Sequence, residues 1–75
     1  MLANMQGYAC SHPLRLAILA LLASDRQREC TAADLRSELP KTPSAAVVDY
    51  HLGVLLGVGL VSERTRGTSP VYGLA

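Results

Sequence analysis

The chain has 75 residues, and its seven Lys and Arg side chains against six Asp and Glu leave a net charge of +1. This length allows a single domain, residues 1–75, with a small core and little room for a catalytic pocket. Hydrophobic residues make up 49% of the chain and charged residues only 17%, which excludes an intrinsically disordered protein.

The start of the chain predicts an N-terminal segment and one firm helix. Residues 1–11 mix small and apolar residues and are expected to form an arm or a short helix. A helix is predicted over residues 12–24, with Ser11 as its cap and Pro13 in its first turn. One face of this helix is apolar, and Arg15 lies off that stripe. The predicted buried residues are Leu14, Ile18, Leu21 and Leu22.

A second, shorter helix is predicted over residues 31–39, after a polar turn at Asp25–Glu29. Thr31 stands three residues before Asp34, which is a variant of the capping box found at helix starts. Pro40 stops this helix because it cannot continue the backbone hydrogen bonds. The predicted buried residues are Leu35 and Leu39, spaced four residues apart.

A third helix is predicted over residues 44–58, with Ser44 as its cap and Gly57–Gly59 at its end. Two short β runs around a Gly/Ser/Pro connection then predict a hairpin over residues 60–74. The fold class is therefore mainly α with a small β-hairpin, a winged helix-turn-helix of three or four helices plus a wing. The predicted buried stripe of the third helix consists of Val48, Leu52 and Leu55.

Three parts of the sequence resemble the arsenical-resistance-repressor (ArsR-type) winged helices. His12–Leu19 resembles the opening of that family, and Val48–Leu55 followed by Gly59–Val61 resembles its recognition helix. Arg64–Gly67 followed by Val71-Tyr72 resembles its wing, so the resemblance covers most of the chain. It implies a bacterial or archaeal transcription regulator of the repressor type that binds double-stranded DNA sequence-specifically, usually as a homodimer. In such proteins the second helix of the pair enters the major groove.

The positive charge excess lies in the half of the chain that would meet DNA. Residues 1–40 hold four basic and four acidic side chains, whereas residues 41–75 hold three and two. Lys41, Arg64 and Arg66 are therefore the predicted phosphate contacts. The alternative for the two arginines is that they are solvated hairpin charges.

The outward side of the third helix is poor in groups that read bases, because no Lys or Arg lies between Lys41 and Arg64. Asp49 would repel phosphates, although a carboxylate can accept a hydrogen bond from a cytosine amino group. His51 lies beside the buried stripe, so it either packs in the core or touches a phosphate. The full set of predicted DNA-binding residues is Lys41, Thr42, Ser44, Ala46, Val47, Asp49, Tyr50, His51, Arg64 and Arg66.

Metal sensing, which many ArsR-type proteins perform, is not predicted here. Their C-x-C pair is missing, since Thr31-Ala32-Ala33 precedes Asp34-Leu35. An alternative cluster of Cys10, His12 and Cys30 would offer three soft ligands, but Cys30 is better explained as a small buried residue and Cys10 as a core or dimer-face residue. We predict no metal, no cofactor and no catalytic residue, and we do not expect an enzyme.

No segment of the sequence marks export or a membrane span. The apolar stretches Leu16–Ala23 and Leu52–Val61 are shorter than the roughly 20 residues that a membrane helix needs. No basic residue precedes Arg15, unlike in a secretory signal peptide. We therefore expect a cytoplasmic protein with free thiols and no membrane partner.

The alternative function is a protein-interaction module on the same scaffold, whose recognition helix no longer reads DNA. Val54 and Leu56 lie in a long apolar run and are expected to form an exposed patch for a protein partner. The ArsR-type dimer interface uses a helix after the wing, whereas this sequence ends at Ala75. The alternatives are that residues 1–9 dimerise alone, or that this domain is one module of a larger protein.

Overall fold

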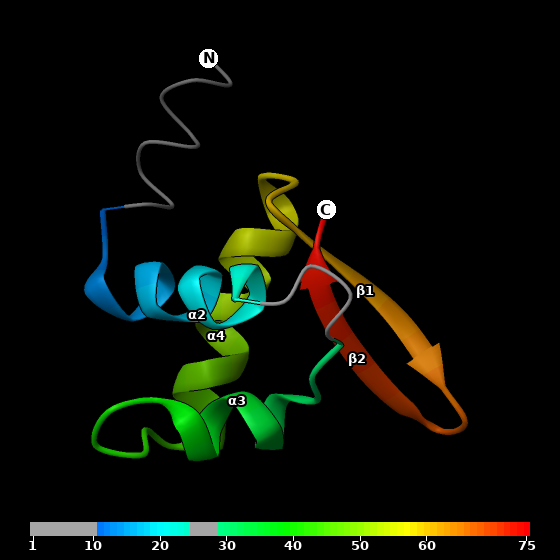
Figure 1. Cartoon of the computed structure of the whole chain (residues 1–75), viewed down its shortest axis with the longest axis horizontal. Coiled ribbons are helices and arrows are strands. Elements are labelled where there is room, and N and C mark those ends of the chain that lie inside the picture. Colours follow the sequence, from blue (N-terminus) through cyan, green and yellow to red (C-terminus); the bar gives the residue numbers. More distant parts are fainter. Residues whose placement is uncertain (1–10, 25–28) are drawn as a thin grey trace.

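The computed structural model of the chain describes residues 11–24 and 29–75. Within these residues, three helices are followed by a two-stranded antiparallel hairpin, which confirms the predicted winged helix-turn-helix fold. Figure 1 shows α2 and α3 crossing α4, with the hairpin extending to one side. The arm predicted for residues 1–11 lies, apart from Ser11, outside the described residues. The elements are α2 (Pro13–Ala23), α3 (Ala32–Glu38), α4 (Ala45–Gly57), β1 (Val61–Arg66) and β2 (Ser69–Leu74).

Helix α2 buries the predicted Ile18 and Leu22, and it also buries Arg15, which was not expected in the stripe. Its buried residues are Arg15, Ile18 and Leu22, which lie on one side of the helix at spacings of three and four. The predicted Leu14 and Leu21 are only half-buried. The prediction that Arg15 lies outside the buried stripe is therefore wrong, because its guanidinium has a partner on α4.

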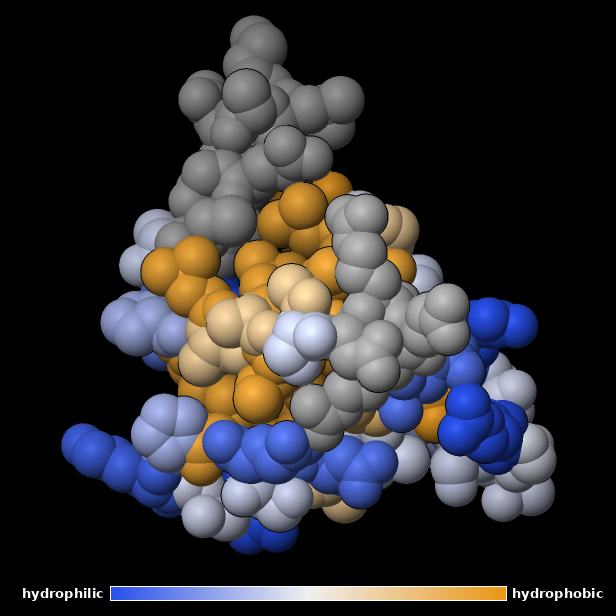
Figure 2. All heavy atoms as spheres, viewed as in Figure 1, coloured by the Kyte–Doolittle hydropathy of each residue, from blue (hydrophilic) through white to orange (hydrophobic). Residues whose placement is uncertain are grey.

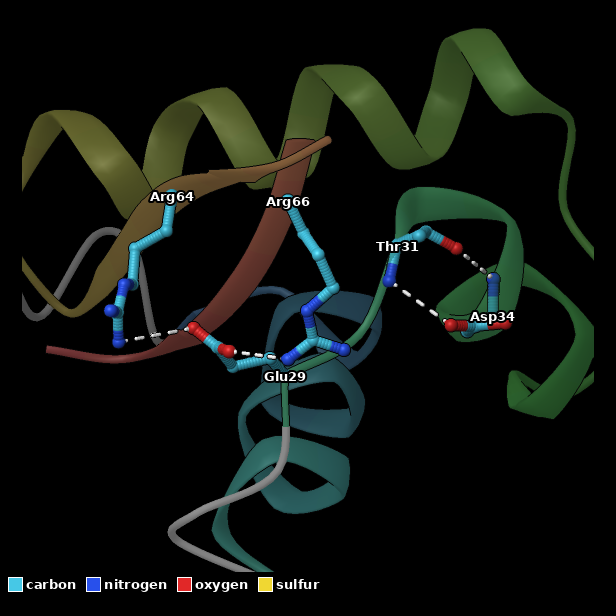
Figure 3. A network of polar contacts seen from close by, with 5 residues as sticks. All are labelled: Glu29, Thr31, Asp34, Arg64 and Arg66. Atoms are coloured by element: carbon cyan, nitrogen blue, oxygen red, sulfur yellow. Dashed lines mark hydrogen bonds and ion pairs between the residues drawn. The ribbon is translucent and has the colours of Figure 1, made fainter. Parts of the chain in front are cut away.

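The helix starts are held by side chains that accept hydrogen bonds from backbone N–H groups. Thr31 and Asp34 form the predicted capping box of α3, with both hydrogen bonds at 3.1 Å (Figure 3). Helix α2 is capped by His12 rather than by the predicted Ser11. The Nδ1 atom of His12 accepts a hydrogen bond from the N–H of Leu14 at 3.1 Å, so the N-cap of α2 is His12, one residue after the predicted Ser11.

The hairpin is paired along its whole length and is tied to the body of the domain. Arg66 faces Ser69 at its tip, where Gly67 supplies the left-handed φ of 64° that the tight turn requires. An isolated bridge joins β2 to the segment before α3. In this bridge Cys30 and Tyr72 exchange backbone hydrogen bonds of 2.9 and 2.7 Å.

The core lies where the three helices meet the base of the hairpin. The predicted stripes of α3 and α4 are confirmed as buried. The prediction of an exposed apolar patch at Val54 and Leu56 is wrong, since both are partly buried and pack against the core. The buried cluster consists of Ile18, Leu22, Cys30, Leu35, Leu39, Val48, Leu52, Leu55, Val61 and Tyr72.

The surface divides into an apolar and a polar region on the face drawn in Figure 2. Hydrophobic residues gather over α2, and hydrophilic residues gather along α3 and the outer end of the wing. Leu16 of α2 is 49% exposed. Within residues 11–24 and 29–75, no helix has the length and apolar character needed to cross a membrane.

Candidate nucleic-acid interface

The turn between α3 and α4 presents two of the predicted DNA-binding residues, Lys41 and Thr42. Both are exposed and have left-handed backbone conformations, with φ of 64° and 42°. These conformations are unfavourable for residues with a side chain, so neighbouring contacts must hold them. Arg36 of α3 provides one, because its Nε donates a hydrogen bond of 2.6 Å to the carbonyl oxygen of Pro43. The turn therefore presents Lys41 just before α4 begins.

Ser44 begins α4 as its N-cap, as predicted. Its Oγ accepts a hydrogen bond from the N–H of Val47 at 3.3 Å. A hydroxyl that accepts in this way still has its own hydrogen to donate. Ser44 is exposed, so this hydrogen is available to a phosphate oxygen.

The outward face of α4 is small, largely apolar and without basic residues. Ala46 and Asp49 are exposed, Val47 is 41% exposed and Tyr50 is 59% exposed. Helix α4 contains no Lys or Arg. Its outward polar groups in the first two turns are thus one carboxylate and one phenolic hydroxyl, which agrees with the poor readout predicted from the sequence.

His51 does not lie on the outward face with the other predicted DNA-binding residues. It is only 6% exposed and packs between α4 and α2. Its Nδ1 lies 3.1 Å from Nη1 of Arg15, which is itself 3% exposed. The ring centroid of His12 lies 4.3 Å from that of His51, and Tyr50 packs edge-on at 5.1 Å. Of the two alternatives for His51, the structure therefore shows packing in the core. A buried His51 cannot contact DNA from the outward face of α4.

The neighbours of His51 determine its charge. A guanidinium group can only donate hydrogen bonds, so the contact with Arg15 requires an unprotonated Nδ1 and a neutral imidazole. Burial lowers the pKa of His51 below its ordinary value of 6.5, and the charges of His12 and Arg15 lower this pKa further. The folded chain therefore holds His51 neutral at neutral pH.

We expect the free energy of unfolding to decrease as the pH falls below about 6.5. Above that pH His51 is neutral in both the folded and the unfolded chain, and its contribution to stability is complete. Below it the unfolded chain binds a proton that the folded chain does not, so stability is lost until the pH reaches the lowered pKa of the folded state. Urea unfolding at a series of pH values from about 7.5 to 5 measures this dependence.

Two histidine variants separate this effect from other titrations. His51→Asn should flatten the pH dependence, because its amide does not titrate. His12→Asn keeps a side-chain acceptor at the N-cap and should retain most of the dependence. An unaltered pH dependence in His51→Asn would contradict the assignment.

The two wing arginines are paired with Glu29, which lies in the predicted polar turn before α3. Nη2 of Arg66 donates to Oε1 of Glu29 at 2.7 Å, and Nη1 of Arg64 lies 3.4 Å from Oε2. Figure 3 shows both side chains reaching from β1 to this one carboxylate. The arginine side chains remain 75% and 69% exposed, whereas that of Glu29 is 23% exposed. The wing thus carries two exposed guanidinium groups held by a single acid.

The two faces of the hairpin carry opposite charges. Side chains alternate between the two faces along a strand, and residues paired across two strands share a face. Glu63 therefore lies on one face with its partner Tyr72, and Arg64 lies on the other face with its partner Val71. Burial raises the pKa of Tyr72, and this pKa is raised further by the hydrogen bond that its hydroxyl donates to the Glu63 carboxylate and by the charges of Glu63 and of Asp49 on α4. Tyr72 belongs to the buried cluster that includes Leu52 of α4, so the face with Glu63 is turned toward α4 and the face with Arg64 is turned away from it.

The alternative metal cluster falls only partly within the described residues. Cys30 is 1% exposed in the core, and Cys10 lies outside the residues that the structure describes. In the described part of the chain, no three His, Cys, Asp or Glu side chains lie close enough together to hold a metal ion.

Comparison with known proteins places this geometry in a family. Residues 11–64, which span the three helices and most of β1, match the family described as "Helix-turn-helix domain". The chain belongs to this helix-turn-helix family. The hairpin completes it as a winged helix-turn-helix domain. No curated protein sequence matches the chain.

Solved structures superpose on nearly the whole winged helix-turn-helix domain. HlyU from Vibrio cholerae N16961 is 28% identical with a TM-score of 0.84, over 99% of this chain and 75% of its own. The homodimeric winged helix-turn-helix DNA-binding domain of Mb0332 from Mycobacterium bovis, a possible ArsR-family transcriptional regulator, is 29% identical with a TM-score of 0.83, over 99% and 64%. An ArsR-like transcriptional regulator from Rhodococcus sp. RHA1 is 26% identical with a TM-score of 0.84, over 99% and 63%.

These matches confirm the ArsR-type resemblance read from the sequence. They also agree with the prediction that the winged helix-turn-helix domain is not an enzyme, since the matched proteins are regulators and DNA-binding domains. The domain spans only 63% to 75% of the lengths of these three structures.

Proposed function

We propose that this domain binds double-stranded DNA as a homodimer and serves as the DNA-binding part of a transcription regulator. The observation that supports this most directly is the superposition of 99% of the chain on winged helix-turn-helix and ArsR-like structures, with TM-scores of 0.83 and 0.84. A helix presented by a preceding helix fits the width of the major groove. In this arrangement the first turns of α4 enter the groove and the wing lies beside the adjacent backbone.

Phosphate contacts would come from three cationic side chains and two hydroxyls. Lys41 stands in the turn before α4, and Arg64 and Arg66 stand on the wing, all three exposed. Thr42 and Ser44 add neutral donors at the start of α4. Three cationic contacts per chain give weak binding, and a homodimer doubles them to about six.

Base contacts would come from the exposed residues in the first two turns of α4. Ala46 and Val47 offer hydrocarbon surface, which suits the methyl group of thymine. Asp49 can accept a hydrogen bond from the amino group of cytosine, and the hydroxyl of Tyr50 can donate or accept. This set of residues favours DNA sites that are rich in thymine and cytosine on the contacted strand. Guanine is recognised best by arginine or lysine, which α4 lacks.

Binding to a random-sequence DNA duplex across a salt series tests the proposed function. Each phosphate that is neutralised contributes about −0.9 to the slope of log K against log salt concentration. Three contacts per chain predict a slope of roughly −3 for a monomer and roughly −5 for a homodimer. Sedimentation equilibrium of the complex then gives the number of chains on the duplex.

A protein-interaction role is the second candidate, because acidic groups stand between α4 and the wing. Asp49 and Glu63 both lie near Tyr72 on the side of the hairpin turned toward α4. These carboxylates would repel phosphates that approach this surface. Undetectable DNA binding at the lowest salt concentration would overturn DNA recognition and favour a protein partner on α4.

A further inference from the structure

Glu29 pairs with both wing arginines, although it is not one of the residues proposed to contact DNA. Its carboxylate oxygens are divided between them, with Oε1 at 2.7 Å from Arg66 and Oε2 at 3.4 Å from Arg64. The backbone of Glu29 is well anchored, because the next residue, Cys30, is bridged to Tyr72 of β2. The backbone that carries this carboxylate is therefore held beside the wing.

The two arginine side chains have much more freedom than the acid that holds them. They are 75% and 69% exposed, against 23% for Glu29. Strand β1, which carries them, is the outer strand, because the segment with Cys30 pairs with β2 on its other side. A long arginine side chain on an outer strand can reach past the strand edge, so its guanidinium is not confined to the face where Glu29 holds it.

We propose that Glu29 competes with DNA phosphates for Arg64 and Arg66, and thereby sets the affinity and the salt dependence of wing binding. The proposal rests on the proposed function, since it concerns the same DNA-binding surface. Carboxylate and phosphate oxygens accept the same N–H donors, so a guanidinium that turns to a phosphate gives up part of its contact with Glu29. The carboxylate left behind also repels the nearby phosphates. Glu29 is in this sense a positioning residue that restrains the wing.

Glu29→Gln in the full chain tests the proposal. Glutamine has nearly the same shape and keeps an acceptor oxygen, so it removes the charge while leaving the local packing in place. The affinity for a random-sequence duplex should increase by about 2- to 30-fold at low salt, the range for releasing two exposed ion pairs. The gain should shrink as salt rises, because the ion pairs are themselves screened. Glu29→Gln should therefore show a steeper salt slope than the unmodified chain.

Two controls separate competition from a general change in charge. The first repeats Glu29→Gln in a chain that also carries Arg64→Gln and Arg66→Gln, where the gain should fall to a small residual. The second is Glu63→Gln, which removes one negative charge from the same hairpin but from its other face. Its effect should be smaller, and it should be the same whether or not the two arginines are present.

The restraint by Glu29 and the DNA-binding function can fail independently. A gain confined to chains that contain the arginines supports the restraint by Glu29. An equal gain with and without the arginines, an equal gain from Glu63→Gln, or weaker binding by Glu29→Gln overturns it while the DNA-binding function stands. Absence of DNA binding by the unmodified chain overturns the proposed function, and the role of Glu29 with it.

Discussion

Replacing Leu52 with alanine is expected to lower the melting temperature of the domain by roughly 10 to 30 °C. Leu52 lies in the middle of α4 and is 1% exposed, so the truncated side chain leaves a cavity among residues that cannot fully close it. Leucine-to-alanine changes at such sites cost about 2–5 kcal/mol. A domain of this size has a stability of only about 4–11 kcal/mol. Thermal unfolding followed by circular dichroism measures the shift.

Leu16→Ala is the matched control for this change. The chemical deletion is the same, but Leu16 is 49% exposed on the outer side of α2. Its removal should lower the free energy of unfolding much less, because little apolar surface leaves a packed environment. Similar losses from both variants would contradict the position of Leu52 in the core.

The combined substitution of Arg64 and Arg66 by glutamine is expected to weaken DNA binding by roughly 10- to 100-fold near 0.1 M salt. Two phosphate contacts per chain are removed, and the slope of log K against log salt should become shallower by about 0.9 for each. The loss should be similar for duplexes of any sequence, because these contacts carry no base information. Fluorescence anisotropy with two unrelated duplexes at several salt concentrations measures both effects.

Thr65→Gln is the control for disturbance of the wing, since Thr65 lies between the two arginines and is exposed on the opposite face of the strand. It should leave affinity and slope nearly unchanged. Replacing both arginines by lysine keeps the charge and should preserve most of the salt slope. A loss confined to one duplex sequence would show that the wing reads bases rather than phosphates.

Local patterns in the sequence are sufficient to predict most of the fold. The capping box at Thr31 depends on residues three apart, and the burial of Leu35, Leu52 and Leu55 follows from helical spacing alone. Such features need no knowledge of the tertiary structure. The order of the elements then indicates the winged helix-turn-helix.

The polar pairs could not be predicted in this way, because their partners are distant in the sequence. Arg15 and His51 are 36 positions apart, and Glu29 and Arg66 are 37 apart. A charged residue next to an apolar stripe is ordinarily solvated, so Arg15 is assigned to the surface unless its partner is known. The same reason explains why the sequence alone places Glu29 in an unremarkable polar turn.

The backbone bridge between Cys30 and Tyr72 separates the base of the wing from its tip, and the two parts are expected to unfold differently. Releasing the Tyr72 amide requires β2 to detach from the segment that leads into α3, and both bridge residues belong to the buried core. The base of the hairpin therefore shares the unfolding cooperativity of the whole domain, whereas the turn at Gly67 can fray alone. The chain itself joins β1 to α4, and the bridge joins β2 to the segment that leads into α3, so the base of the wing is tied to both helices.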